Sequence, residues 1–222
     1  MMKRGWLLLA ATLVLTGCVR TPALSARSVT ETQNSVVDGK TTLDELLQRY
    51  GQPENRSPTA TGKVNVGWKR IWSDNPLHAA NVSRLNVLVD KQVVIRHIFT
   101  RYPLTLNNNF LKDATKESLG AVIKPGVTTE SSMISRFGQP VSYTFSDEGE
   151  KIMLYLWQDI TDDASRMIPI VGGFIGTQSG PVYTLLITLN DNGTVKAWDL
   201  IHAQGKRGAG IMNASAIKLT PQ

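Results

Sequence analysis

Apolar and polar residues alternate along several segments of this chain, and a period of two predicts half-buried β-strands. The segments with this pattern are residues 64–72, 85–89, 92–99, 152–157, 183–189 and 195–201. Asp90-Lys91 predicts a hairpin turn between the second and third segments, and Asp191-Asn192-Gly193 predicts a stronger one between the last two. Short turns of this kind join antiparallel strands, so we expect antiparallel sheets.

A helical period precedes the first strands. The apolar residues recur at i, i+3, i+4 and i+7 and therefore share one helix face: Leu43, Leu46, Leu47 and Tyr50. Thr42, with Glu45 three residues later, is typical of a capping box at a helix start. Gly51 and Pro53 then end the helix, and the glycine is expected to be a left-handed C-cap.

This helical block is repeated. Residues 39–53 return 87 residues later as residues 126–140, with the glycine, the Thr-Thr pair, the arginine and the Gly-Gln-Pro ending unchanged. Met133, Ile134 and Phe137 repeat most of the apolar face. The second helix cap is predicted to be weaker, because no glutamate stands at its third helical position. So many matches in one ungapped block indicate a tandem duplication.

The elements are expected to form the same unit twice, in the order helix, helix, strand, strand, strand. A shorter helix is expected before each repeated block, at residues 30–37 and 116–123. The predicted fold class is therefore α+β, with two tandem units that each combine a helix pair and a three-stranded antiparallel sheet. The expected divisions are a signal peptide 1–17, a tether 18–29, a first unit 30–105, a linker 106–115, a second unit 116–205 and a C-terminal tail 206–222.

The first residues have the pattern of a bacterial lipoprotein signal. Lys3 and Arg4 precede an apolar run, residues 7–15, which is shorter than the roughly 20 residues that span a bilayer and so favours a cleaved export signal. The run ends in Leu15-Thr16-Gly17-Cys18, which resembles the lipobox, and Cys18 is the single cysteine of the chain. We therefore expect Cys18 to be lipidated and to anchor the mature protein to a membrane. The alternative is an ordinary signal peptide cleaved elsewhere, which would leave a free thiol.

The residue after Cys18 and the overall composition indicate where the protein is located and which partners are excluded. Val19 follows the cysteine, where an aspartate is the usual inner-membrane retention signal of enterobacterial lipoproteins, so the outer membrane on its periplasmic face is favoured. Contents of 41% hydrophobic and 19% charged residues describe an ordinary globular protein. The net charge of +6 comes from scattered lysines and arginines, which argues against a nucleic-acid partner.

The second unit contains an apolar, glycine-rich insertion, residues 167–176, that the first unit lacks. Exposed apolar loops tend to mark interaction sites. The tip of this loop is therefore a candidate contact with a partner protein or the bilayer: Gly172, Gly173 and Phe174. The alternative is that the loop packs on the edge of the sheet and completes the core.

No pattern of catalytic or metal-binding residues stands out. The three histidines lie far apart in the sequence, with no partner at metal-ligand spacing: His78, His97 and His202. Three clustered aspartates are spaced unlike an EF-hand loop and are interpreted as a solvated turn: Asp159, Asp162 and Asp163. We therefore expect no enzyme, no cofactor, no metal and no small-molecule substrate.

Taken together, the repeated block and the last hairpin resemble the BamE-like (SmpA/OmlA) family of outer-membrane lipoproteins, whose units start with Gly-x-Thr and end the helices with Gly-x-Pro. Gly126-Val127-Thr128 and Gly138-Gln139-Pro140 match this pattern, and Ile168-Pro169-Ile170-Val171-Gly172 is similar to a loop of that family. Lys40 departs from it, because an apolar residue is usual after the first glycine. A tandem pair of such units is also similar to the β-lactamase-inhibitor-protein architecture.

Three functional classes follow from these patterns. The BamE-like resemblance implies a membrane-anchored, periplasm-facing lipoprotein that serves as a non-catalytic accessory or scaffold in outer-membrane assembly or maintenance, through contacts with envelope proteins. The second resemblance implies a protein-binding inhibitor module. The third interpretation is an enzyme or ligand-binding lipoprotein whose site has no recognisable motif.

Overall fold

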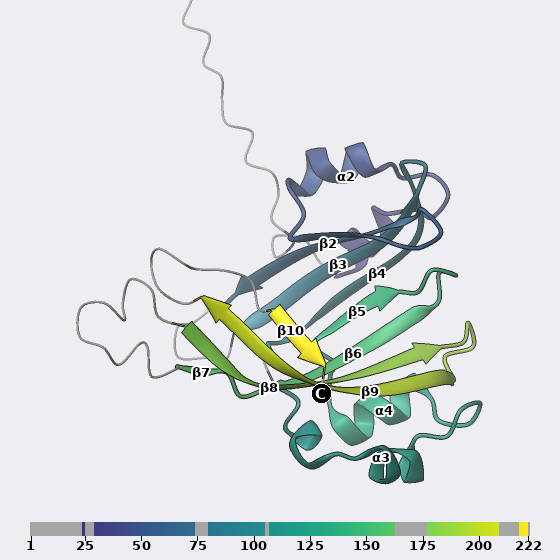
Figure 1. Cartoon of the computed structure of the whole chain (residues 1–222). Helices are drawn as coiled ribbons and strands as arrows, with labels where there is room; N and C mark the ends of the chain where they lie inside the picture. Colours follow the sequence, from purple (N-terminus) through teal and green to yellow (C-terminus); the bar gives the residue numbers. More distant parts are fainter. Residues whose placement is uncertain are drawn as a thin grey trace, which may run out of the picture.

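The protein consists mostly of β-structure, and the predicted α+β class is wrong. The computed structural model describes Leu24 and residues 29–73, 80–104, 107–162, 177–208 and 218–221. These residues form one four-stranded and one six-stranded antiparallel sheet, with α-helices of only six to eight residues (Figure 1). No helix in this part of the chain is long and apolar enough to cross a membrane.

The first unit has two short helices and a four-stranded meander. Its helices are α1 (Val29–Asn34) and α2 (Leu43–Tyr50). Its strands are β1 (Asn55–Pro58), β2 (Val64–Trp72), β3 (Asn81–Asp90) and β4 (Val93–Pro103). Each strand pairs with the next one along the chain.

The second unit repeats the order of two α-helices before a sheet, and its last two long strands are longer than those of the first unit. Its helices are the 3₁₀ helix η2 (Asn109–Asp113), α3 (Lys116–Val122) and α4 (Glu130–Phe137). Its strands are β5 (Ser142–Phe145), β6 (Lys151–Gln158), β7 (Thr161–Asp162), β8 (Thr177–Leu189), β9 (Val195–Gly208) and β10 (Lys218–Pro221). The sheet order is β10-β9-β8-β6-β5, and β7 pairs with β8 beside this path.

The strands that the sequence pattern misses are short, and most lie at sheet edges. β1 reads Asn-Arg-Ser-Pro with every side chain exposed, β5 has four residues, and β10 extends the second sheet beside β9. β1 takes its backbone hydrogen bonds from β2 and has no buried face, so hydrophobic alternation does not reveal it. β5 does alternate, with Tyr143 and Phe145 buried, but it is too short to give a clear period. Pairing at the edges therefore enlarges both predicted three-stranded sheets.

The repeated sequence makes the same backbone contacts in both units. Gly39 and Gly126 both have φ of +76°, and their N–H groups donate to the carbonyl oxygens of Val94 and Val195 at 2.7 Å. In each unit these bonds join the segment before the longer helix to the last hairpin of the sheet. The helix is thereby placed on its own sheet in the same way twice.

Both longer helices begin with a capping box. Thr42 and Glu45 exchange the two expected hydrogen bonds, and Thr129 and Ser132 do the same, because the serine hydroxyl substitutes for a glutamate. The predicted weaker second cap is thus wrong. The glycines that end these helices have φ of +77° and +80° with ψ of −160° and −172°. That region is open essentially only to glycine, and it is not the left-handed helical cap predicted from the sequence.

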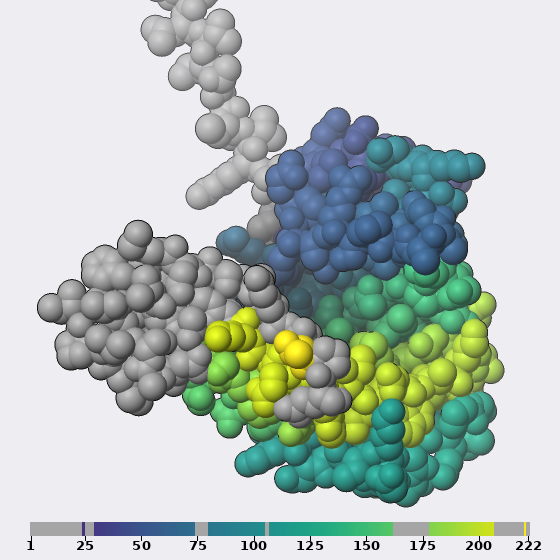
Figure 2. Space-filling model, viewed as in Figure 1, coloured from purple at the N-terminus to yellow at the C-terminus, as the bar shows by residue number. Residues whose placement is uncertain are grey.

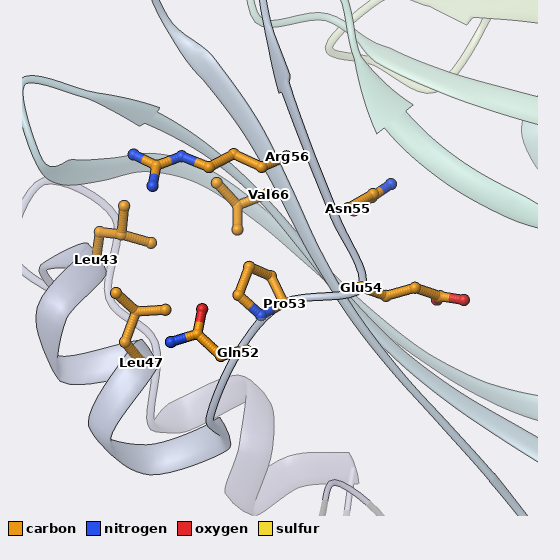
Figure 3. A pocket seen from close by; sticks show the side chains of 8 residues that line it. All are labelled: Leu43, Leu47, Gln52, Pro53, Glu54, Asn55, Arg56 and Val66. Carbon is orange, nitrogen blue, oxygen red and sulfur yellow. The ribbon is translucent and has the colours of Figure 1, made fainter. Parts of the chain in front are cut away.

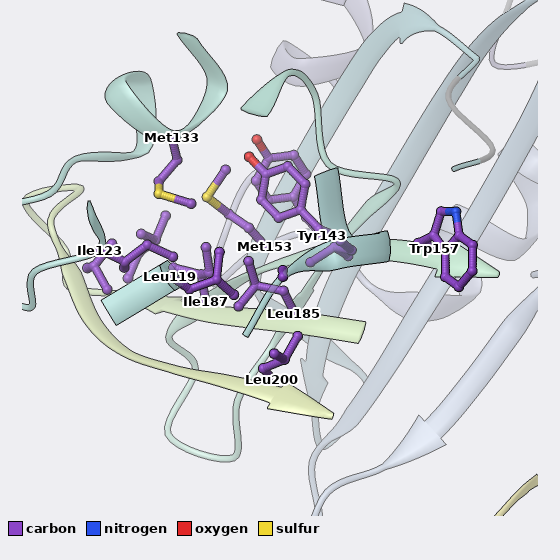
Figure 4. Packing of buried hydrophobic residues seen from close by; sticks show 14 residues of the cluster. Leu119, Ile123, Met133, Tyr143, Met153, Trp157, Leu185, Ile187 and Leu200 are labelled. Atoms are coloured by element: carbon purple, nitrogen blue, oxygen red, sulfur yellow. The ribbon is translucent and has the colours of Figure 1, made fainter. Parts of the chain in front are cut away.

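Each unit has its own hydrophobic core. Figure 4 shows the second, where Met133 of α4 lies over Met153 and Tyr143 of the sheet. The most buried residues of the helices are Leu46 and Met133, at 0% and 1% exposed, whereas their neighbours Leu47 and Ile134 are only partly buried. In each helix, therefore, the first residue of the apolar pair faces the core and the second lies at the margin of the core.

Polar contacts join the two units. Asn65 of β2 donates from Nδ2 to the carbonyl oxygen of Phe145 at 2.9 Å, and its Oδ1 accepts from the Phe145 N–H at 3.2 Å. Arg96 of β4 pairs with Asp191 of the second unit at 2.9 Å. The first unit thus lies against the β5 side of the second sheet, and Figure 2 shows their side chains in contact.

Candidate functional site

A groove of about 340 Å³ opens between α2 and the edge strand β1. The residues that line it are Leu43, Leu47, Gln52, Pro53, Glu54, Asn55, Arg56 and Val66. Figure 3 shows that Leu43, Leu47 and Val66 point into it, while Arg56 extends across it. The side chains of Glu54 and Asn55 point away from it.

The second unit shows what occupies the equivalent place. Arg56 stands three residues after the first Gly-Gln-Pro, and Tyr143 stands three residues after the second. Arg56 pairs across its sheet with Val66, as Tyr143 does with Met153. Tyr143 is 4% exposed and belongs to the second core, whereas Arg56 is exposed. The groove therefore lies where the second unit buries an aromatic ring.

The side chains around this position also differ between the two units. In the second unit Glu130 forms an ion pair with Lys151, whose Nζ lies 5.5 Å from the centre of the Tyr143 ring. Burial, and then the charge of Glu130, raises the pKa of Tyr143. The repeat places Leu43 and Val64 at the positions of this ion pair in the first unit. Two apolar side chains thus replace the charges, and the first unit has the more apolar site.

The electrostatics of the groove come from one residue. Glu54 is paired with Lys69 and is turned away, so Arg56 is the charged group that reaches across the opening (Figure 3). Leu43 and Val66, each 2% exposed, form an apolar floor. An apolar side chain with a carboxylate next to it would complement this arrangement, because an arginine binds a carboxylate by charge-assisted hydrogen bonds.

The groove is lined by apolar, amide and charged side chains. Its lining has no serine, cysteine or histidine. Elsewhere in the described chain, no three His, Cys, Asp or Glu side chains are grouped to hold a metal ion. His97 Nδ1 lies 2.7 Å from Asp38 Oδ1, and the ring of His202 lies 4.2 Å from that of Tyr183.

The site residues predicted from the sequence stay predictions. Cys18, Gly172, Gly173 and Phe174 all lie outside the described residues. Sequence reasoning missed the groove itself, because the repeated block ends at Gly-Gln-Pro. A signal for the groove was present three residues after this block, where the first copy has Arg56 and the second copy has Tyr143.

One contact close to the predicted anchor is described. Leu24 is 4% exposed in the first core, and its carbonyl oxygen accepts a hydrogen bond from Arg101 Nη2 at 2.9 Å. Arg101 Nε donates to Ser83 Oγ at 3.0 Å, and the guanidinium lies 5.5 Å from the centre of the Trp72 ring. Leu24 is therefore fixed to the first sheet six residues after Cys18.

Comparison with known proteins gives little further constraint. The sequence matches no known family and no curated protein. A solved structure to which it is similar is that of a protein from Streptococcus mutans with the provisional name beta-lactamase inhibitor protein. The match has 13% sequence identity and a TM-score of 0.31, and it covers 77% of this chain and 93% of that one. Values this low carry no argument about function.

Proposed function

We propose that this chain is a periplasm-facing lipoprotein, anchored to the outer membrane through lipidated Cys18, that binds envelope proteins as a non-catalytic accessory or scaffold. Leu15-Thr16-Gly17-Cys18 supports the anchor, because that sequence resembles the lipobox. A lipid on Cys18 provides membrane attachment without a spanning helix. The resemblance to BamE-like lipoproteins supports the role in the envelope.

The open groove beside α2 carries the protein-binding part of this proposal. Its occupant is a large apolar or aromatic side chain of a partner protein, with a carboxylate next to it that pairs with Arg56. Tyr143 supports this choice, because the second unit buries an aromatic ring at the equivalent place. Burying one such side chain contributes about 1.5–3 kcal/mol. A few buried anchors of this kind supply most of the binding energy of many interfaces.

The anchor is tested by metabolic labelling with a fatty acid. Wild-type protein should incorporate the label and float with the outer membrane on a density gradient. Cys18→Ala should lose the label, because the acylated sulfur is gone. Label that persists undiminished in this variant would contradict lipidation at Cys18.

The groove is tested with short peptides and purified full-length protein in detergent. Acetyl-Glu-Tyr-Glu-amide should shift the methyl NMR signals of Leu43 and Leu47, whereas Glu-Ala-Glu and Lys-Tyr-Lys peptides should not. Arg56→Glu should reverse the preference between the acidic and the basic peptide. Equal shifts from all three peptides would show that neither the ring nor the carboxylate is recognised.

The repeat offers a matched control in cells. A photo-cross-linking amino acid at Gln52, at the mouth of the groove, should give a discrete product that Arg56→Glu abolishes. The same amino acid at Gln139, the equivalent position of the second Gly-Gln-Pro, should not give that product. The same product from both positions would contradict binding at the groove.

A further inference from the structure

Leu24 limits how far the folded protein can lie from a lipid on Cys18. The two residues are six positions apart, and an extended chain covers about 3.3–3.6 Å per residue, so they are separated by at most about 20 Å. If the chain were held only from the next described residue, Val29, which begins α1 and packs against the first core, the path to Cys18 would be longer. The reach would then be about 40 Å. The end of the sheet that holds Leu24 is therefore kept close to the anchor.

That end consists of the last residues of β2 and β4 and the first of β3. The pairing of the strands places Arg70, Ser83 and Arg101 in one row across the sheet. Trp72 lies beside this row, because its indole N–H donates to Ser83 Oγ at 3.3 Å. Ile71 is 46% exposed and Arg70 is exposed. Arg70 and Trp72 thus lie on the face of the sheet that holds Leu24, and Ile71 lies on the opposite face of the same strand end.

The charged side chains among the described residues of this end are all basic. Residues 70–73, 80–84 and 100–104, the described ends of the three strands, contain three arginines and no aspartate or glutamate. Basic residues near a membrane are attracted to anionic head groups. Tryptophan and exposed aliphatic side chains favour the boundary between head groups and acyl chains. Both the chemistry and the short reach therefore favour a lipid surface as the occupant.

We propose that the end of the first sheet around Leu24 is turned towards the bilayer, so that Arg70 on one face reaches anionic head groups and Ile71 on the other face reaches the interface. Arg101 acts indirectly, because it holds the Leu24 carbonyl and so fixes this end near the anchor. The proposal rests on the lipidation of Cys18. The protein then stands on the membrane in one orientation rather than swinging on a long tether.

Fluorescence quenching on vesicles tests this orientation. Acylation uses the natural thiol of Cys18, so a cysteine introduced into the full-length lipidated protein is the single free thiol for a fluorophore. Ile71→Cys is the test position, and Val127→Cys, 74% exposed in the second unit, is the control. In vesicles of phosphatidylcholine and phosphatidylglycerol with nitroxide-labelled head groups, the label at 71 should be quenched much more strongly than the label at 127. Equal quenching, or stronger quenching at 127, would overturn the proposal.

Two further variants separate the contribution of Arg70 to membrane docking from that of the Leu24 contact. Arg70→Gln in the Ile71→Cys protein should lower the ratio of docked to undocked protein about fivefold, because one basic residue contributes about that factor at an anionic surface. Arg101→Ala should weaken quenching at 71 by releasing Leu24, and a melting curve shows whether the variant stays folded. Quenching at 71 that is unchanged in a folded Arg101→Ala protein would contradict the role of the Leu24 contact.

Protein that fails to acquire a lipid refutes the proposed anchor, whereas acylated protein on vesicles without quenching at 71 refutes only the orientation.

Discussion

Replacing Arg56 with tyrosine should stabilise the protein, because the second unit already has tyrosine at this position. A fully buried tyrosine covers about 150–250 Å², but the groove is open on one side, so we take about 100 Å² as newly buried. At about 25 cal/mol per Å² this contributes about 2.5 kcal/mol. Ordering the side chain costs about 1 kcal/mol, which leaves a net gain of about 1.5 kcal/mol. For a chain of this size the melting temperature should rise by roughly 3–6 °C.

Thermal unfolding followed by circular dichroism measures this gain, with Arg56→Thr as the control, since threonine suits a strand but has no ring to fill the groove. Arg56→Tyr should also lose the cross-link from Gln52, because its own ring occupies the site. The reverse change, Tyr143→Arg, removes a buried ring and should cost more than about 3 kcal/mol. If Arg56→Tyr melts no higher than Arg56→Thr, the groove does not fit an aromatic ring and the argument from the repeat is refuted.

Four more predictions follow from the helices. Leu46→Ala should cost about 2–5 kcal/mol, because this side chain is fully buried, whereas Leu47→Ala should cost clearly less in chemical denaturation. Gly138→Ala should cost on the order of 1–3 kcal/mol for its positive φ, although no atom lies within 4 Å of the added Cβ. By contrast, Gly120→Ala inside α3 should stabilise by about 1 kcal/mol. The backbone N–H of Thr42, and then its side chain, lower the pKa of Glu45. The capping hydrogen bonds of Glu45 should therefore persist as the pH falls below the ordinary glutamate pKa, and they should be lost only as the pH falls through the lowered pKa. An NMR titration of the Thr42 amide signal measures this, and the Glu45→Gln variant should show no such transition.

Local chemistry allowed several elements to be predicted from the sequence. Thr42 with Glu45 forms its capping box, and the alternating segments form the long strands β2, β3, β4, β6, β8 and β9. The hairpin after β3 turns one residue later than predicted, at Lys91 and Gln92, with φ of +46° and +72°. The anchor at Cys18 stays a prediction from the sequence. Each of these features depends on residues close together in the chain, so a short window contains the information.

Other features were decided only when distant segments came together. β1 exists because β2 offers it backbone partners, since its own four residues are polar or proline and all exposed. β5 has two buried aromatic residues but only four residues in all, and pairing with β6 fixes it as a strand. Leu46, rather than Leu47, became the buried residue through the way α2 lies on its sheet. The groove at Arg56 and the hydrogen bond from Arg101 to the Leu24 carbonyl oxygen likewise join segments that are separated in the sequence. Burial and pairing depend on which surfaces meet in space, and no local pattern of residues records that.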